Sequence, residues 1–276
     1  MLDRTTEMHT EVEIELTAGG LHEALRRVRH AMCREEIRYY LDGVFMHHVA
    51  RVGALRFVAT DGNRLATADI GTAEGAETIR PVILSRPFVV EAIRGTSKRR
   101  DAFRQVRLTI GEDYARLTYW DGSATDGPLV DGTFPEYERV IPRGEPQHGT
   151  ATIAREPLLR AVTGLTEFAK ASGRKWPVNP ILRFAFAADK LTLSAVMEDS
   201  GAACRGSASV DVDVATSTMN EPGIVGFYGP HILDILNSLQ VQHVRFEFFD
   251  AGGPNKFVGD NSDGSALHVI MPVRVP

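Results

Sequence analysis

Short segments of β type run through most of the chain, and in some of them, such as Glu11–Leu16 (EVEIEL), apolar and polar residues alternate strictly. A period of two places one face of a strand in a core and the other toward solvent. The sequence predicts strands at Glu11–Leu16, Tyr39–Val49, Ala54–Thr60, Arg107–Ile110 and Ala115–Tyr119 in the first half, and at Gly149–Ile153, Leu182–Ala187, Lys190–Val196, Val244–Phe249 and Ala266–Pro272 in the second. Tight turns are predicted at six Asp-Gly dipeptides, which begin at Asp42, Asp61, Asp121, Asp126, Asp131 and Asp263.

Helical periodicity is confined to a few segments. In the first of them Leu21, Leu25, Val28 and Met32 form one apolar stripe at 100° per residue. The predicted helices are Gly20–Arg34, Arg86–Thr96, Glu156–Ala171 and Pro230–Leu239. A few helices among many short strands predict an α+β fold.

The order of these elements repeats along the chain. In each half a strand leads to a helix, then to a run of strands, a second helix and more strands. We therefore predict two similar domains, each with two helices packed on antiparallel sheets. The polar, breaker-rich stretch PRGEPQHG marks their boundary. The predicted division is a tail at 1–10, a domain at 11–142, a linker at 143–149 and a domain at 150–276.

Composition narrows the class of protein. Of 276 residues 43% are hydrophobic and 24% are charged, which is typical of a globular protein, and no apolar run is long enough for a membrane span. The polar N-terminus does not resemble a signal peptide, and two distant cysteines, Cys33 and Cys204, are expected to be reduced thiols in a cytoplasmic protein. The net charge of −5 argues against a generic basic coat for nucleic acid, although it does not exclude local DNA contact.

Basic residues lie opposite the apolar stripes of three predicted helices. An ordinary solvated face is one interpretation, and a surface that attracts DNA phosphates without reading bases is the other. The fourth helix fits the second interpretation poorly, because its outward residues His231, Asp234 and Asn237 include no Lys or Arg. The candidate DNA-facing residues are Arg26, Arg27, Arg34, Arg94, Lys98, Arg160, Lys170 and Arg174.

Motifs that carry catalytic chemistry are missing from the sequence. It contains no Walker motif, GxGxxG, GxSxG or HExxH. His47 and His48 are adjacent on a predicted strand, so they point to opposite faces and are poorly placed to share a metal. We therefore expect a protein that is not an enzyme and that has no metal site and no cofactor.

Several segments carry a resemblance to a known family. Arg38–Phe45 (RYYLDGVF), Phe57–Ala66 (FVATDGNRLA) and Val130–Pro142 (VDGTFPEYERVIP) resemble the middle domain of the bacterial DNA polymerase III beta sliding clamp. Ile232–Leu239 resembles the second helix of that family's last domain, and His268–Arg274 (HVIMPVR) resembles its C-terminal segment. The resemblance covers about residues 11–276, and the family's first domain has no counterpart in it.

This resemblance implies a DNA clamp fold in which helices line a central hole and sheets face outward. It also implies a non-catalytic processivity factor that encircles duplex DNA and tethers a DNA polymerase, and that binds the clamp loader and other replication and repair proteins, through short peptides. The implied hydrophobic cleft comprises Arg38, Leu41, Thr60, Gly62, Arg64, Leu65, Pro135, Arg139, Val140, Val269, Ile270, Met271, Pro272, Val273 and Arg274. Taken singly, Leu41, Leu65, Val140 and Ile270 are equally well explained as core residues.

The sequence also departs from the family pattern. Asn63 stands where the family usually has His, and Tyr228 and His231 stand where it tends to have Asn and Tyr. The family closes its ring with six domains from two chains, so a chain with two such domains predicts a homotrimer. A clamp-like decoy or regulator that binds the peptides without encircling DNA is the alternative.

Overall fold

The computed structural model describes residues 11–71, 75–171, 180–187, 189–197, 206–219, 223–260 and 266–275. The chain folds into two compact units, each with its own internal contacts. The first comprises Met1–Asp61 and Thr67–Pro135, and the second comprises Gly62–Ala66 and Glu136–Pro276. The predicted linker 143–149 thus falls within the second unit.

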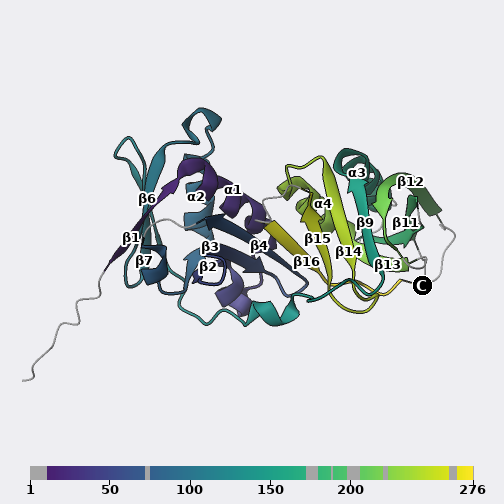
Figure 1. Ribbon diagram of the computed structural model, residues 1–276, viewed down its shortest axis with the longest axis horizontal. Coiled ribbons are helices and arrows are strands. Elements are labelled where there is room, and N and C mark those ends of the chain that lie inside the picture. The colour runs from purple at the N-terminus through teal and green to yellow at the C-terminus, as the bar shows by residue number, and fades with distance from the viewer. Residues whose placement is uncertain are drawn as a thin grey trace, which may run out of the picture. The chain divides into compact units, whose positions relative to one another are not determined.

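The first unit consists of antiparallel sheets with two helices (Figure 1). Its sheets have the strand orders β1-β6-β7-β8 and β4-β3-β2-β5, where β4 belongs to this unit from Thr67 onward. Its elements are β1 (Val12–Thr17), α1 (Ala18–Val28), β2 (Gly43–Val49), β3 (Ala54–Thr60), β4 (Arg64–Gly71), β5 (Val82–Ser85), α2 (Arg86–Gly95), β6 (Gln105–Ile110), β7 (Tyr114–Thr118) and β8 (Ala124–Pro128).

The second unit repeats this plan. Its strands follow the order β13-β10-β11-β12-β9-β14-β15-β16. Its elements are β9 (Gly149–Ala154), α3 (Arg155–Ala171), β10 (Ile181–Phe186), β11 (Lys190–Met197), β12 (Gly206–Ser217), β13 (Gly223–Tyr228), α4 (Gly229–Ser238), β14 (His243–Phe248), β15 (Asn255–Gly259) and β16 (Ala266–Ile270). Strand, helix, four strands, helix and three strands therefore occur in the same order in both halves of the chain. The predicted pair of similar α+β domains is confirmed.

Helix α1 begins where the sequence provides a cap. The hydroxyl oxygen of Thr17 accepts a hydrogen bond from the Gly20 backbone N–H at 3.2 Å, which satisfies one of the amides left open at a helix start. The helix ends at Val28 and passes through a 3-10 turn, Arg29–Ala31, to an extended Met32. The predicted helix Gly20–Arg34 was therefore too long at its C-terminus, and Arg34 lies outside it.

The predicted strand Tyr39–Val49 was wrong over its first residues. Glu36–Leu41 forms 3-10 turns that contain a kink at Arg38 (φ −105°, ψ 44°). The strand begins only at Gly43, where the backbone approaches β5 closely. A Cβ on Gly43 would lie 2.4 Å from the carbonyl oxygen of Leu84, so a side chain does not fit there.

The Asp-Gly dipeptides form turns at some of the predicted places. Gly62 (φ 88°) and Gly122 (φ 85°) adopt the left-handed backbone that favours glycine. Asp126 and Gly127 instead lie within strand β8, and Gly43 opens β2, so those two turn predictions were wrong. The dipeptide at Asp263 lies outside the described residues.

The two cores differ in composition. The first unit buries mainly aliphatic side chains together with Phe57 and Phe88. The second buries six phenylalanines at 2% exposure or less, and the Phe246 ring lies 4.9 to 5.9 Å from four of the others. These six are Phe184, Phe186, Phe227, Phe246, Phe248 and Phe257. No helix in the described part of the chain is long and apolar enough to cross a membrane.

Candidate functional site

The basic face of α1 is partly covered and is paired with an acid of the same helix. The side chains of Arg26 and Arg27 are 16% and 17% exposed, and their guanidinium nitrogens lie 2.7 Å and 3.7 Å from the Glu23 carboxylate. Burial of Glu23 works to raise its pKa, but the hydrogen bond from Arg26 and the charges of both arginines outweigh this, and the pKa is lowered. Glu23 thus neutralises part of the positive charge that the sequence places on α1.

The other candidate DNA-facing residues are more exposed. Arg94 on α2 is 72% exposed and pairs with Glu91 at 2.7 Å, and Lys170 on α3 pairs with Glu167 at 2.8 Å. Arg34 and Lys98 are also exposed, but both follow the ends of their helices. Arg160 is exposed on α3, and Arg174 lies outside the described residues. Three of the predicted helices therefore carry exposed or half-covered basic groups.

Helix α4 carries no Lys or Arg, and its outward carboxylate, Asp234, occupies the position that Glu91 has in α2. Asp234 Oδ2 accepts a hydrogen bond from Arg64 Nη1 at 2.7 Å, with the Arg64 side chain 10% exposed and the Asp234 side chain 47% exposed. These two residues are 170 positions apart in sequence. The outward acid of α4 therefore binds the segment Gly62–Ala66, which belongs to the same unit.

The C-terminal segment is held by the main chain on two sides. The Met271 N–H donates to the Asn63 carbonyl oxygen at 2.8 Å, and the Val273 N–H donates to the Gly226 carbonyl oxygen at 2.9 Å. A Cβ on Gly226 would lie 2.6 Å from the Val273 carbonyl oxygen, so a glycine is needed for this approach. With its backbone fixed in this way, the segment leaves Met271 39% exposed.

The predicted cleft residues of the second unit fall into two groups. Leu65, Val269 and Ile270 are at most 3% exposed, so they are buried rather than at the surface. The groups that reach solvent are Met271 and Val140, 39% and 48% exposed, together with Gly62, Arg139 and Arg274. Arg64, Pro272 and Val273 are half-buried between these groups.

The predicted cleft residues of the first unit divide in the same way. Leu41 is 4% exposed and Thr60 is 8% exposed, whereas Pro135 is exposed. The Arg38 guanidinium donates to the Asp61 carbonyl oxygen at 2.7 Å and to the Glu35 carboxylate at 3.0 Å, which fixes it beside the β3–β4 turn. Leu41 is thus buried, as its interpretation as a core residue expects, and Thr60 is buried as well.

Sequence reasoning missed three residues that organise the C-terminal segment. Gly226 and Asp234 carried no signal for this role, because periodicity cannot pair residues so far apart along the chain. Asn63 was noted only as a departure, yet its carbonyl oxygen anchors Met271. The other departures, Tyr228 and His231, form an edge-to-face pair with ring centroids 5.5 Å apart at the start of α4.

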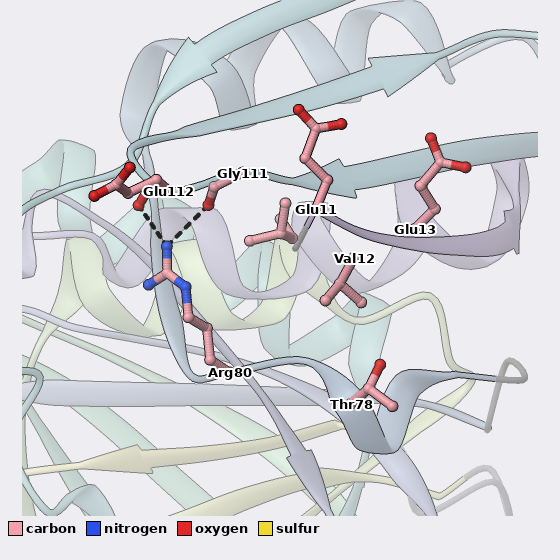
Figure 2. Close-up of a pocket in the computed structure, with 8 residues that line it drawn as sticks. Glu11, Val12, Glu13, Thr78, Arg80, Gly111 and Glu112 are labelled. Atoms are coloured by element: carbon pink, nitrogen blue, oxygen red, sulfur yellow. Dashed lines mark hydrogen bonds between the residues drawn. The ribbon is translucent and has the colours of Figure 1, made fainter. Parts of the chain in front are cut away.

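A cavity of about 840 Å³ lies in the first unit, among residues that the sequence did not single out. In Figure 2 the Arg80 guanidinium points to the β6–β7 turn, where it donates to the carbonyl oxygens of Gly111 and Glu112 at 2.9 and 2.5 Å. The remaining lining residues are Glu11, Val12, Glu13, Thr78 and Ile110. This lining offers no histidine and no cysteine, and no cluster of metal ligands occurs among the described residues.

Two α+β units of the same element order, with helices that carry basic groups and a fixed C-terminal segment, define a DNA clamp fold. Residues 15–136 match the family described as the central domain of the DNA polymerase III beta subunit. The chain belongs to the beta sliding clamp family. Curated members of that family align with it over most of its length.

The similarity extends over both units. The beta sliding clamp of Caulobacter vibrioides is 30% identical over 95% of the chain, and that of Escherichia coli K12 is 27% identical over 96%. The chain spans 66% of the length of each of these relatives. A crystal structure of the Caulobacter crescentus clamp superposes with a TM-score of 0.83 at 28% identity, covering 99% of this chain and 68% of that one. The Bartonella birtlesii clamp, solved with griselimycin bound, gives 0.82 at 31% identity, covering 96% and 66%.

Proposed function

We propose that this chain is a DNA sliding clamp, a processivity factor that encircles duplex DNA in the cytoplasm. It tethers a DNA polymerase and other replication and repair proteins through short peptides, and it catalyses no reaction itself. The observation that carries this proposal is the likeness over the whole chain, since 99% of it superposes on a beta sliding clamp with a TM-score of 0.83.

The proposed peptide site is built around the C-terminal segment. Met271 offers an exposed apolar side chain on a backbone fixed by Asn63 and Gly226, beside the half-buried Pro272 and Val273. An apolar surface of this kind, with a few fixed polar groups, suits the Leu or Phe side chains of short peptides. Griselimycin binding by the Bartonella relative shows that a member of the family takes a small ligand.

The proposed DNA contact is electrostatic. Phosphates would meet exposed cations such as Arg94 and Arg160, and such contacts are indifferent to sequence and steeply dependent on salt. The negative net charge is compatible with this role, because the local distribution of cations decides where DNA binds.

A ring of six such domains, if it is built only from copies of these 276 residues, contains three copies. If each domain turns the ring by about a sixth, as in the family's six-domain rings, two chains of two domains leave an arc and three chains close it. Closure would also cover sheet edges whose backbone groups are otherwise open to pairing. We therefore propose a homotrimer.

The test combines size with retention on DNA. Light scattering coupled to chromatography should give three times 30.3 kDa for the chain. After a clamp loader has acted, the protein should stay on closed circular DNA and slide off the same DNA once it is linearised. Arg94→Glu should reduce retention, whereas Arg143→Glu, the same charge change at a 78% exposed residue outside the predicted DNA-facing set, should not.

The alternative is a clamp-like decoy that binds the same peptides without encircling DNA. It predicts a stable monomer or two-fold dimer, unaltered peptide binding, and equal loss from circular and linear DNA. That combination of results would replace the sliding clamp proposal with the decoy.

A further inference from the structure

The segment between α2 and β6 in the first unit exposes an aromatic ring to solvent. Phe103 is 92% exposed, more than any other large apolar side chain in the described part of the chain. Exposing a phenylalanine forgoes the stabilisation that burial of its ring would give the fold. The fold gains nothing visible from this side chain, which points to a role in binding.

The backbone around Phe103 is fixed on both sides. The Ala102 carbonyl oxygen accepts a hydrogen bond from the Gly19 N–H at 2.9 Å, and the Arg104 carbonyl oxygen accepts one from the Ala18 N–H at 2.8 Å. The first turn of α1 therefore holds the residues before and after Phe103. A ring presented in this way gives up little further freedom when a partner binds it.

Cations lie on both sides of Phe103 in the sequence, and Arg100 and Arg104 share the carboxylate of Asp101. Asp101 is 8% exposed, and its carboxylate lies 2.9 Å from Arg104 Nε and 3.6 Å from Arg100 Nε. The side chains of Arg104 and Arg100 nevertheless stay 56% and 81% exposed. Lys98 and Arg99 are exposed as well, so the segment Lys98–Arg104 carries four cations against one acid.

A second aromatic residue lies beside these cations. The Arg104 guanidinium carbon is 5.6 Å from the centroid of the Trp120 ring, which belongs to the turn between β7 and β8. The acid of this turn, Asp121, accepts hydrogen bonds from Ser123. Trp120 itself is half-buried, so Phe103 is the exposed ring of the pair. An exposed aromatic ring among cations is an arrangement that binds single-stranded nucleic acid, because a base stacks on the ring and phosphates meet the charges.

We propose that Lys98–Arg104, together with Trp120, binds unpaired nucleotides of a DNA strand. A base stacks on Phe103, and the flanking phosphates contact Arg99 and Arg100. A duplex keeps its base faces stacked on one another, so the ring distinguishes single strands from duplex while the arginines do not. This proposal rests on the proposed function, since it gives a DNA clamp a second contact for the unpaired strand at a primer–template junction.

The test is fluorescence anisotropy with a fluorescein-labelled oligo(dT) of about 15 nucleotides, in parallel with a duplex of equal length. Phe103→Ala should weaken oligo(dT) binding about tenfold and leave duplex binding within about twofold, because it removes one stacking interaction. Phe103→Tyr should restore binding, whereas Phe103→Leu should not. Ile224→Ala, which removes an apolar side chain that is 45% exposed on β13, is the matched control and should change neither affinity.

The contribution of Arg99 and Arg100 is measured separately, by the salt dependence of binding. Replacing Arg99 and Arg100 by Gln should lower the salt dependence of oligo(dT) binding by about 0.7 in logarithmic slope for each phosphate that the variant no longer neutralises. Unchanged oligo(dT) affinity in Phe103→Ala, with duplex binding intact, would overturn this proposal and leave the sliding clamp standing. Rescue by Leu as well as by Tyr would also overturn it, in favour of an apolar protein partner. Failure of the wild-type chain to bind oligo(dT) would overturn this proposal alone, because the sliding clamp proposal is tested by retention on circular DNA after loading.

Discussion

The two units share an element order, yet the outward face of the second helix carries an exposed cation in the first unit and no Lys or Arg in the second. Helix α2 presents Arg94, which is 72% exposed and makes only a local pair with Glu91. Helix α4 presents Asp234, which holds the 10% exposed Arg64 of the segment Gly62–Ala66. One helix thus keeps a cation at the surface, while the equivalent helix uses a carboxylate to fix a distant segment of its own unit.

The cores differ as well. Six buried phenylalanines fill the second unit, whereas aliphatic side chains fill most of the first. A shared topology therefore fixes neither the packing nor the charge of a face. In this chain both units keep exposed cations on a helix, such as Arg94 and Arg160, but only in the second unit does an acid of the second helix hold a distant segment. Substitutions in the two units should separate these roles.

The largest effect is expected in the aromatic core. Phe246 is fully buried and contacts Phe186, Phe227 and Phe248. Phe246→Ala should lower the free energy of unfolding of the second unit by about 3–5 kcal/mol, because it removes buried area and leaves a cavity. Urea unfolding followed by circular dichroism would measure this loss. A loss below about 1 kcal/mol would show that the second core repacks freely.

The strands and helices were predictable where periodicity is local. The strand Ala54–Thr60 has the predicted bounds, and the predicted helix Arg86–Thr96 differs by one residue from α2. Errors arose where tertiary contacts decide the backbone. Gly43 starts β2 because the chain passes against Leu84, and nothing in the local pattern shows this.

The candidate site was less accessible to sequence reasoning. Motif resemblance pointed to the C-terminal segment, but it could not tell that Leu65 and Ile270 lie below the surface. It also could not pair Arg64 with Asp234, because that contact depends on how α4 packs. The sequence shows that α4 breaks the pattern of basic helices. Only the structure shows what its outward acid does, which is to pair with Arg64.

The pairing of Arg64 with Asp234 should matter more than that of Arg94 with Glu91. Asp234→Ala removes the acid from a guanidinium that is 10% exposed, and should lower stability by about 1–2 kcal/mol. Arg94→Ala removes half of an exposed helical pair and should change stability by less than about 0.5 kcal/mol. Thermal unfolding of both variants tests the contrast, which fails if the two losses are equal.

Peptide binding should depend on the exposed methionine. Met271→Ala should weaken a clamp-binding peptide, expected to bind at about micromolar Kd, by at least about 1 kcal/mol. Val210→Ala, at an apolar residue of β12 that is 41% exposed, is the control and should leave the affinity unchanged. Calorimetric titration measures both. Leu65→Ala is a poorer probe, because Leu65 is 3% exposed and its truncation would perturb the core. Full affinity in Met271→Ala would move the peptide site elsewhere.

The smallest effect concerns Glu23, which moderates the basic face of α1. Its folded-state pKa is depressed, so its contribution to stability is present above the unfolded pKa and is lost as the pH falls through the folded value. Glu23→Gln should therefore cost less than about 1 kcal/mol at neutral pH, and the difference from wild type should disappear in acid, where the wild-type carboxyl is protonated as well.

The same substitution releases the charges of Arg26 and Arg27, so retention on circular DNA should rise while stability falls. Denaturation at acidic and neutral pH measures the expected loss of stability. Retention on circular DNA at constant salt measures the expected gain in DNA binding. A fall in both quantities would mean that Glu23 acts on the fold alone and that α1 makes no contact with DNA.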